Sequence, residues 1–354
     1  MTEIKDTRRF KGNNLIWILI LVTLLYMFLA SFAEVFVQGL VYSPGQSPAM
    51  RFINEYYTPT IGAIVTLVIV CLVVRKNRFI LRSFLPKGMG NNFRPVVIED
   101  TYKPTQENTA RNLLIGLLLG FLTNFFCILC ALIHGDIKLY FDCSASMIPI
   151  FLYALLMVFI QSTSEELWCR GFMYERINIH YPLWVSVIIN GIFFGLLHCF
   201  NPGVSVLAIV GIAICGISYS LVRWYTGSIW VVMGIHTMWN FTQNFIFGLP
   251  NSGLVSEASI FHLDAATGIS NLIYSYEFGV EAAIPALFVD GLLGVACLLL
   301  ARRDGRLGEL MMSYEKRAAL AQEAQQAAEA DAQENAYEAD VQDNTETNQK
   351  KAEI

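Results

Sequence analysis

The chain has 354 residues, of which 55% are hydrophobic and only 15% are charged. Soluble domains average about 25% charged residues, so this composition excludes an ordinary soluble domain. The net charge of −5 says little about partners, because most of the acidic excess lies in one tail, and we expect no nucleic-acid partner.

Apolar segments of membrane-crossing length recur along the chain. About 20 apolar residues cross the hydrocarbon core of a bilayer. The predicted spans are 14–41, 59–74, 112–133, 147–168, 182–200, 203–222, 228–249 and 281–301. The first is too long for the core of a signal peptide, so we expect no cleaved signal. The cysteines, most of them within these segments, are interpreted as small apolar packing residues.

Lysine and arginine are concentrated in every second connection between the spans, and this pattern predicts the orientation of the chain in the membrane. Basic residues fill the N-terminal tail, the 75–111 loop and the segments after the fourth, sixth and eighth spans, but there are none from 250 to 280. Both termini are therefore predicted to be cytoplasmic. We expect a multi-pass integral protein of a bacterial plasma membrane, in contact with lipid and of unknown oligomeric state.

The predicted domain organisation is simple. A cytoplasmic tail covers 1–13, an eight-span membrane domain covers 14–301, and an acidic Ala/Gln-rich cytoplasmic tail, partly helical or disordered, covers 302–354. We find no internal repeat and no second globular domain.

The segment SEELWCRGF ends the fourth span and contains two adjacent carboxylates and an arginine. Ionisable residues are costly inside a bilayer, so each indicates a function. Glu166 and Arg170 are four residues apart in the favourable order for an ion pair on one helix face. Glu165 points about 100° away from Glu166 and has no cation at that spacing. We therefore predict that Arg170 neutralises Glu166 and that Glu165 is free to act.

Two later spans add polar side chains at helical spacing. Asn190, Phe194 and His198 line up in the fifth span. In the seventh span, His236 and Asn240 share one face, which Gln243 and Asn244 continue. Glu34 and Asp290 are isolated acids in the first and eighth spans, and we assign them no catalytic role.

Together these residue types favour water activation. A Glu beside a His can hold a water and take its proton, and a second His with an Asn amide can donate hydrogen bonds to an oxyanion. Amide hydrolysis fits this set. The sequence has neither a GxSxG nor an HExxH motif.

Three short motifs carry a family resemblance. They are Glu165-Glu166-x-x-x-Arg170, Phe194-x-x-x-His198 and His236-x-x-x-Asn240, each on its own span. In this order they resemble the CAAX-protease and bacteriocin-processing family, also called Abi, whose eukaryotic members are the type II CAAX prenyl endopeptidases. The resemblance covers 147–245, the expected catalytic core.

The resemblance implies an intramembrane endopeptidase, all-α, with about eight transmembrane helices around a polar cavity. By carry-over, Glu165 and His198 activate the water, and His236 and Asn240 stabilise the oxyanion. Glu166 and Arg170 support the site, and Phe194 fixes the ring of His198 by packing. The expected substrates are membrane-associated peptides or proteins, with prenylated proteins among the possibilities.

Metal dependence stays open at this point. Glu165, His198 and His236 are the residues that would form a His2Glu zinc site with one open position. These ligands come from three different helices with no supporting spacing, so we favour catalysis without a cofactor.

The depths of the candidate residues pose a problem. In straight helices, Glu165 lies near the cytoplasmic end of its span and His198 near the opposite end of the next, about 20 Å apart. We therefore expect the fourth span to continue as one helix to about residue 178, with Pro182 opening the next helix. We favour a cavity that opens to the cytoplasm, because Glu165 is nearer that face.

Two other classes of function fit the sequence less well. A non-catalytic adaptor, immunity or regulatory protein on the same fold is one alternative, although the complete residue set speaks against lost activity. A proton-coupled transporter is the other, and the absence of inverted repeats makes it the weakest.

Overall fold

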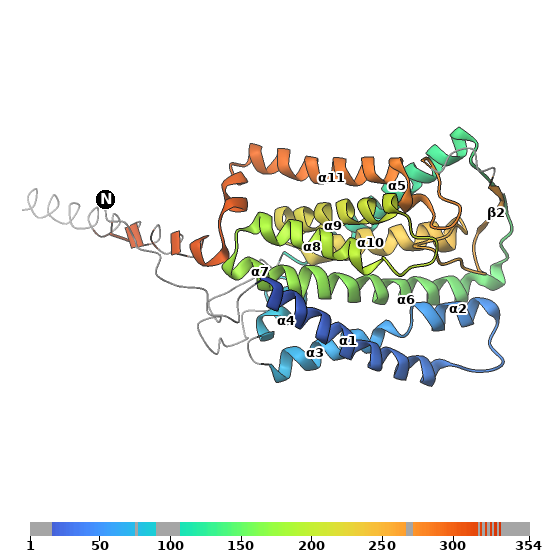
Figure 1. Cartoon of the computed structure of the whole chain (residues 1–354), viewed down its shortest axis with the longest axis horizontal. Helices are drawn as coiled ribbons and strands as arrows, with labels where there is room; N and C mark the ends of the chain where they lie inside the picture. The colour runs from blue at the N-terminus through green and yellow to red at the C-terminus, as the bar shows by residue number, and fades with distance from the viewer. Residues whose placement is uncertain are drawn as a thin grey trace, which may run out of the picture.

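The protein is a bundle of helices that lie side by side (Figure 1). The computed structural model describes residues 16–74, 77–89, 107–266 and 272–317, with isolated positions between 319 and 333. Within these residues, six helical segments are long and apolar enough to cross a membrane: Ile16–Val41, Pro48–Val73, Ala110–His134, Ala145–His180, Val206–Thr226 and Ile284–Arg303. A shorter apolar helix, Leu183–Leu197, accompanies them. The chain is a mostly helical, polytopic membrane protein, as predicted.

The helices follow the predicted spans in order. They are α1 (Ile16–Val41), α2 (Pro48–Tyr56), α3 (Thr60–Val73), α4 (Arg78–Phe84), α5 (Ala110–His134), α6 (Ile148–Glu166), α7 (Tyr174–His180), α8 (Leu183–Leu197), α9 (Val206–Thr226), α10 (Ile229–Phe241) and α11 (Ile284–Arg303). The 3-10 helices are η5 (Ala145–Met147), η8 (Val280–Ala282) and η9 (Leu307–Met311), and the π-helices are η6 (Leu167–Met173) and η7 (Thr242–Ile246). A helix lies at each of the eight predicted spans, but α8 and α10 have only 15 and 13 residues.

The fourth span continues well beyond its predicted end, as the depth argument required. α6, η6 and α7 form one 36-residue helical segment together with the turn η5, from Ala145 to His180. The segment runs along the whole bundle (Figure 1). Pro182 is the N-cap of α8. Because the helix is this long, Glu165 lies near its middle rather than at its end.

The π-helix η6 follows directly after the two carboxylates. A π-turn frees backbone groups from the regular helical ladder, and such turns cluster at functional sites. Here the side chain of Asn190 donates a hydrogen bond of 2.6 Å to the carbonyl of Cys169 within η6. Ser220 in turn donates to Asn190 Oδ1 at 3.2 Å. Asn190, singled out in the sequence, therefore ties α8 and α9 to η6.

Glycines let the central helices approach closely. A Cβ on Gly191 of α8 would come within 2.4 Å of Ile217 in α9. A Cβ on Gly116 or Gly120 of α5 would lie 2.1 or 2.2 Å from a carbonyl oxygen of α10. Small residues at helix crossings are typical of membrane bundles, where close backbone contact drives association. These crossings hold α8 against α9 and hold α10, most of whose residues are buried, against α5.

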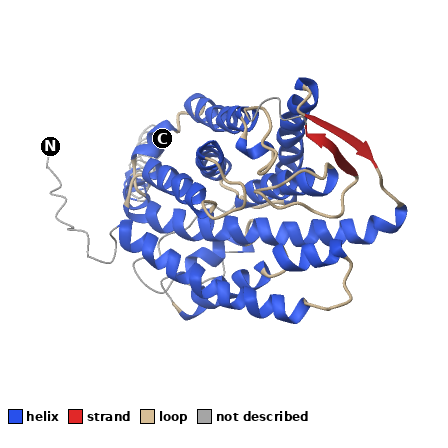
Figure 2. Ribbon diagram, turned by 45° about the vertical axis from the view of Figure 1, so that its right-hand side comes forward, coloured by secondary structure: helices blue, strands red, loops and turns tan. Residues whose placement is uncertain are grey.

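A two-stranded sheet, which the all-α prediction did not include, lies at one end of the bundle (Figure 2). β1 (Ile137–Phe141) pairs antiparallel with β2 (Phe261–Ala266), with an irregularity between Lys138 and Leu139. We call this the sheet end. The C-terminal end of α11 and the short helices α4 and α7 lie at the opposite end, which we call the basic end (Figure 1).

The basic end collects most of the described basic side chains that predicted the orientation. They include Arg82, Arg111, Arg176, Arg223, Arg302, Arg303 and Arg306. The sheet end has Arg51 and Lys138. The cytoplasmic location of the termini stays a prediction, as do the domain boundaries. The basic residues of the N-terminal tail and much of both the 75–111 loop and the acidic tail lie outside the described residues.

Candidate active site

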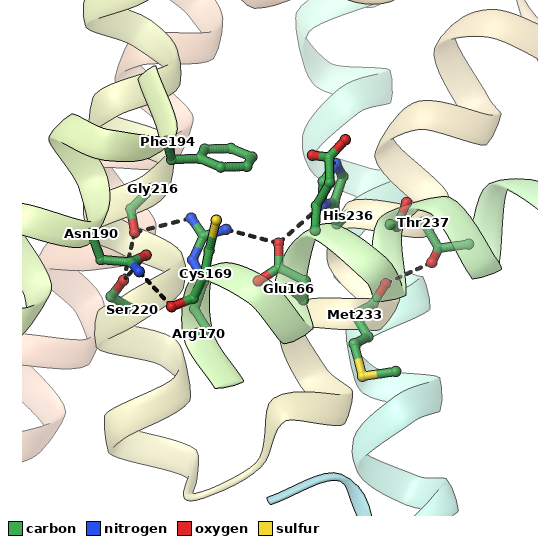
Figure 3. Close-up of polar contacts among 12 residues, drawn as sticks. Glu166, Cys169, Arg170, Asn190, Phe194, Gly216, Ser220, Met233, His236 and Thr237 are labelled. Atoms are coloured by element: carbon green, nitrogen blue, oxygen red, sulfur yellow. Dashed lines mark hydrogen bonds and ion pairs between the residues drawn. The ribbon is translucent and has the colours of Figure 1, made fainter. Parts of the chain in front are cut away.

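A buried ion pair forms the base of the candidate site, as the spacing of the two residues predicted (Figure 3). Arg170 Nη1 donates to Glu166 Oε1 at 3.0 Å, and both side chains are fully buried. Arg170 Nη2 donates to the carbonyl of Gly216 in α9 at 3.2 Å. The guanidinium also lies over the ring of Phe194, 4.3 Å from its centroid. Cation–π contact and hydrogen bonds thus compensate the charge inside the protein.

Glu166 has a second partner that the sequence did not predict. His236 Nδ1 lies 2.9 Å from Glu166 Oε1 (Figure 3). A carboxylate only accepts hydrogen bonds, so Nδ1 carries the proton in this contact. The other ring nitrogen, Nε2, is then directed away from the ion pair. It lies 3.8 Å from Glu165 Oε2.

Glu165 has a different environment from Glu166. Its Oε1 accepts a hydrogen bond from Gln161 Nε2. Its Oε2 makes no hydrogen bond to any described residue. Gln161 Oε1 accepts from Asn240 Nδ2 at 3.2 Å, so Gln161 links the carboxylate to the amide of the third motif. The prediction that Arg170 engages Glu166 rather than Glu165 agrees with this geometry.

Gln161 was missed in the sequence. The available signal was its position one turn before Glu165, on the same helix face, within an otherwise apolar run. Gln161 presents an amide that both donates to Glu165 and accepts from Asn240. It therefore fixes the relative position of two of the predicted site residues.

His198 is held by the helix that carries it. Its Nδ1 lies 2.8 Å from the carbonyl oxygen of Phe194, which fixes the proton on Nδ1. The Phe194 and His198 rings pack edge-to-face with centroids 4.9 Å apart, as the predicted packing role of Phe194 requires. Phe194 also packs edge-to-face against His236, at 6.0 Å. One aromatic ring thus lies against both histidines.

All four predicted catalytic side chains line one cavity. Its volume is about 370 Å³, and its walls include Glu165, His198, His236 and Asn240. A smaller cavity of about 40 Å³ shares the two histidines and Asn240 and extends to Glu281 and Asp290. A water needs at least about 10–15 Å³, so both spaces have room for it. Glu34 lines the larger cavity and Asp290 the smaller, so both isolated acids face cavities.

The cavity opens toward the sheet end. Tyr56 at the end of α2, Asn201 after α8, and Asn251 and Leu254 in the loop before β2 all line it. We expected a cytoplasmic opening because Glu165 is nearer that face of its predicted span, but in the 36-residue segment Glu165 lies near the middle. If the termini are cytoplasmic, the cavity opens on the other side of the membrane.

A loop residue at the cavity wall has an unusual backbone. Ser252 has φ of 50°, the one described non-glycine residue with a positive φ. Its backbone N–H and its hydroxyl both donate to Glu281 Oε2 at 2.9 Å, and its carbonyl accepts from Asn201 Nδ2 at 3.1 Å. Burial raises the pKa of Glu281 to about 7, although the bonds from Ser252 oppose this shift. No pattern in the sequence indicated this contact, because its partners lie far apart in the chain.

Other predicted polar positions serve the scaffold. Gln243 donates to the carbonyl of Pro250 and accepts from Asn124. Asn244 donates to the carbonyls of Leu249 and Leu254 at 3.1 and 2.9 Å. These bonds hold the loop after α10, so the polar stripe beyond Asn240 stabilises this loop.

The three possible zinc ligands do not form a metal site in this arrangement. Within the described residues, no group of three or more His, Cys, Asp or Glu side chains is close enough to hold a metal ion. Glu165 and His236 lie close together, whereas His198 is directed into the cavity from the far end of α8. The donor set does not fit a His2Glu zinc site, and we derive no step through a metal.

The comparison with protein families agrees with the predicted motifs. The family model described as "Type II CAAX prenyl endopeptidase Rce1-like" matches residues 147–242. The match covers α6 to α10 and contains every residue of the three motifs, while α1–α5 and α11 lie outside it. No curated protein matches the chain. Residues 147–242 thus form an Rce1-like domain of the type II CAAX prenyl endopeptidase family.

Proposed function

We propose that this protein is an intramembrane endopeptidase that hydrolyses peptide bonds of membrane-associated substrates. One observation carries the proposal. Glu165 Oε2 has no hydrogen-bond partner among the described residues and lies 3.8 Å from His236 Nε2, on the wall of a cavity that His198 and Asn240 also line. Family membership of the domain supports proteolysis of peptide substrates in general. The residue roles that follow are part of the proposal.

In this mechanism Glu165 is the general base. A water bound between its carboxylate and His198 loses a proton to Glu165 as its oxygen attacks the carbonyl carbon of the substrate. The C–O bond forms, and the carbonyl oxygen becomes an oxyanion. When the C–N bond breaks, Glu165 returns the proton to the leaving amine. One water is consumed, and a carboxyl and an amino terminus are released.

His236 and Asn240 stabilise the oxyanion. Asn240 has one amide hydrogen engaged with Gln161, so its second remains for the substrate. His236 donates from Nε2 when it is protonated on both nitrogens, and the carboxylate of Glu166 at 2.9 Å favours that cation. Each such donor is typically worth about 3–4 kcal/mol in the transition state. Arg170 holds the carboxylate of Glu166 in place through its hydrogen bond of 3.0 Å.

The test is the Glu165→Gln variant, which keeps the shape of the side chain and removes the base. Cleavage of a membrane-anchored reporter peptide by purified enzyme in nanodiscs should fall about 10²–10⁴-fold, the usual contribution of a general base. The thermal midpoint should stay unchanged. Glu55→Gln, at an exposed glutamate of α2, is the matched control and should retain full activity.

Two outcomes would contradict the proposal. Undiminished cleavage by Glu165→Gln would remove the assigned base. Loss of activity after thorough chelation, restored by zinc, would replace the mechanism with a metal-dependent one. If neither the wild type nor the variants cleave and both complement a deletion strain, the protein acts as an adaptor.

A further inference from the structure

The large cavity has one wall that does not belong to the Rce1-like domain. α6, α8 and α10 contribute the side chains of the candidate catalytic site. The opposite wall comes from α1 and the α2–α3 segment, and it includes Met27, Ala30, Glu34, Tyr57 and Ala63. These residues lie well before the matched region, which begins at residue 147. This wall is therefore where the chain can determine its own substrate preference.

Glu34 has a fixed position on this wall. α1 and α3 cross at Gly62, where an added Cβ would lie 2.5 Å from the carbonyl carbon of Ala33 and 2.7 Å from the nitrogen of Glu34. The backbone at Glu34 is thus locked against α3 by direct contact. A carboxylate on such a rigid support can select a ligand, because little reorganisation is needed on binding.

Glu34 also has no partner. None of the described residues forms a hydrogen bond or ion pair with its side chain, and neither lysine nor arginine is among the residues that line the cavity. A carboxylate inside a membrane protein is costly when it is unpaired. Glu34 differs in this respect from Glu166 and Glu175, which each have an arginine.

The surroundings of Glu34 favour a long cationic side chain. Met27 and Ala30 lie on the same helix, two turns and one turn before Glu34, and both line the cavity. They provide an apolar surface for the methylene groups of a lysine or arginine, whose charged head would reach the carboxylate. Tyr56 and Tyr57 add aromatic rings that attract cations.

The charge of the sheet end points in the same direction. Among the described residues of the connections 135–147 and 247–283, the exposed acidic residues are Asp142, Glu257, Asp264 and Glu277, and Lys138 is the one lysine or arginine. An excess of acidic side chains at this end raises the local concentration of cationic ligands and repels acidic ones.

We propose that Glu34 is a specificity-determining residue that binds a lysine or arginine side chain of the substrate peptide in the active-site cavity. The substrate class is then a membrane-associated peptide with a basic residue close to the scissile bond, reaching the cavity from the sheet end. The inference rests on the proposed function only where it concerns cleavage of the substrate. Binding of the basic residue can be measured without turnover.

The binding experiment uses the Glu165→Gln protein in nanodiscs, so that no cleavage interferes. The probes are membrane-anchored fluorescent peptides of Ala, Leu and Ser that carry a single Lys, norleucine or Glu at scanned positions. With Glu34 present, the best Lys peptide should bind about tenfold tighter than its norleucine counterpart, as for a hydrogen bond to a charged group. Adding Glu34→Gln should abolish this difference, and Glu34→Lys should reverse it in favour of the Glu peptide. Glu55→Gln is the matched control and should leave the difference intact.

The cleavage experiment repeats the series in the background that retains Glu165. The ratio of kcat/KM between Lys and norleucine peptides should fall to about one in Glu34→Gln. If wild type and Glu34→Gln cleave both peptides with equal efficiency, Glu34 does not select the substrate and the inference is overturned, while the protease assignment stands. If nothing is cleaved but the Glu34-dependent preference in binding persists, the proposed function fails and the cation site stands. Equal binding of all peptides to every variant would also overturn the inference.

Discussion

Two buried arginine–glutamate pairs have their glutamates on the same long helix, and only one of them contacts a residue that lines the cavity. Arg170 and Glu166 approach to 3.0 Å, and Arg223 and Glu175 to 2.9 Å. None of the four side chains is more than 3% exposed. Glu166 also accepts a hydrogen bond from His236 on the cavity wall, whereas Glu175 lies further along, toward the basic end. A buried ion pair alone therefore does not indicate a catalytic site. The indication here is that Glu166 also binds and orients His236.

The largest expected effect is a difference in cleavage activity between variants of the two pairs. Glu166→Gln should lower kcat about 10²–10⁴-fold, because His236 loses the carboxylate that fixes its proton and favours its cationic form. Glu175→Gln should leave kcat per folded molecule unchanged. The measurement is cleavage of the reporter peptide, normalised to the monodisperse fraction after size-exclusion chromatography.

The two pairs should contribute about equally to the free energy of unfolding. Removing one partner of a buried ion pair costs about 3–5 kcal/mol, because the other charge stays buried and uncompensated. Both variants should therefore unfold at a similarly lowered temperature. If Glu175→Gln lost activity as strongly as Glu166→Gln, the distinction between a site pair and a scaffold pair would be wrong.

A second prediction concerns the packing of α8 against α9, which determines where Phe194 and His198 lie relative to the pair of Arg170 and Glu166. Gly191 lies in α8, which also carries Phe194 and His198, and a Cβ there would be 2.4 Å from Ile217 and 2.8 Å from the carbonyl oxygen of Ala213. Gly191→Ala should cost about 1–3 kcal/mol by overpacking and should lower activity, because α8 must move away from α9. Differential scanning fluorimetry and the cleavage assay measure the two effects.

Gly291 of α11 provides the matched control. A Cβ at this position meets no atom within 4 Å. Gly291→Ala should therefore be neutral or stabilise the helix by up to about 1 kcal/mol. Equal losses in the two variants would mean that the α8–α9 crossing has no special role in placing His198.

The sequence predicted those features that depend on spacing within one helix. The i,i+4 pairing of Glu166 with Arg170 and the edge-to-face packing of Phe194 with His198 follow from local geometry, and both are present. The extension of the fourth span to His180 also followed, because only a longer helix brings Glu165 to the depth of the histidines. Helical periodicity defines the face on which a residue lies, and these predictions needed nothing more.

Features that depend on how separate segments meet were not predictable in this way. The bond from His236 to Glu166 and the contact of Glu281 with Ser252 join residues whose relative heights no periodicity defines. The end toward which the cavity extends could not be derived from periodicity for the same reason, since it depends on the connections that line the cavity. The small sheet pairs two strands from loops that are far apart in the chain. These strands are short and mix polar with apolar residues, so their sequence pattern is weaker than that of the neighbouring apolar helices.

The smallest effect tests a third buried carboxylate, which has a serine in place of an arginine. Glu281 precedes α11, and burial raises its pKa to about 7 from an ordinary value of 4.5. Between these two values the folded state binds the proton more tightly than the unfolded state, so stability should fall as the pH rises from about 5 toward 8. The thermal midpoint of the wild type should drop over this range by roughly 2–4 °C more than that of Glu281→Gln, whose side chain does not titrate. Glu277→Gln, at an exposed neighbour, should behave as the wild type. Identical pH profiles for wild type and Glu281→Gln would show that the carboxyl at 281 does not titrate in this range. In that case Glu281 would resemble the arginine-paired carboxylates despite having Ser252 as its partner.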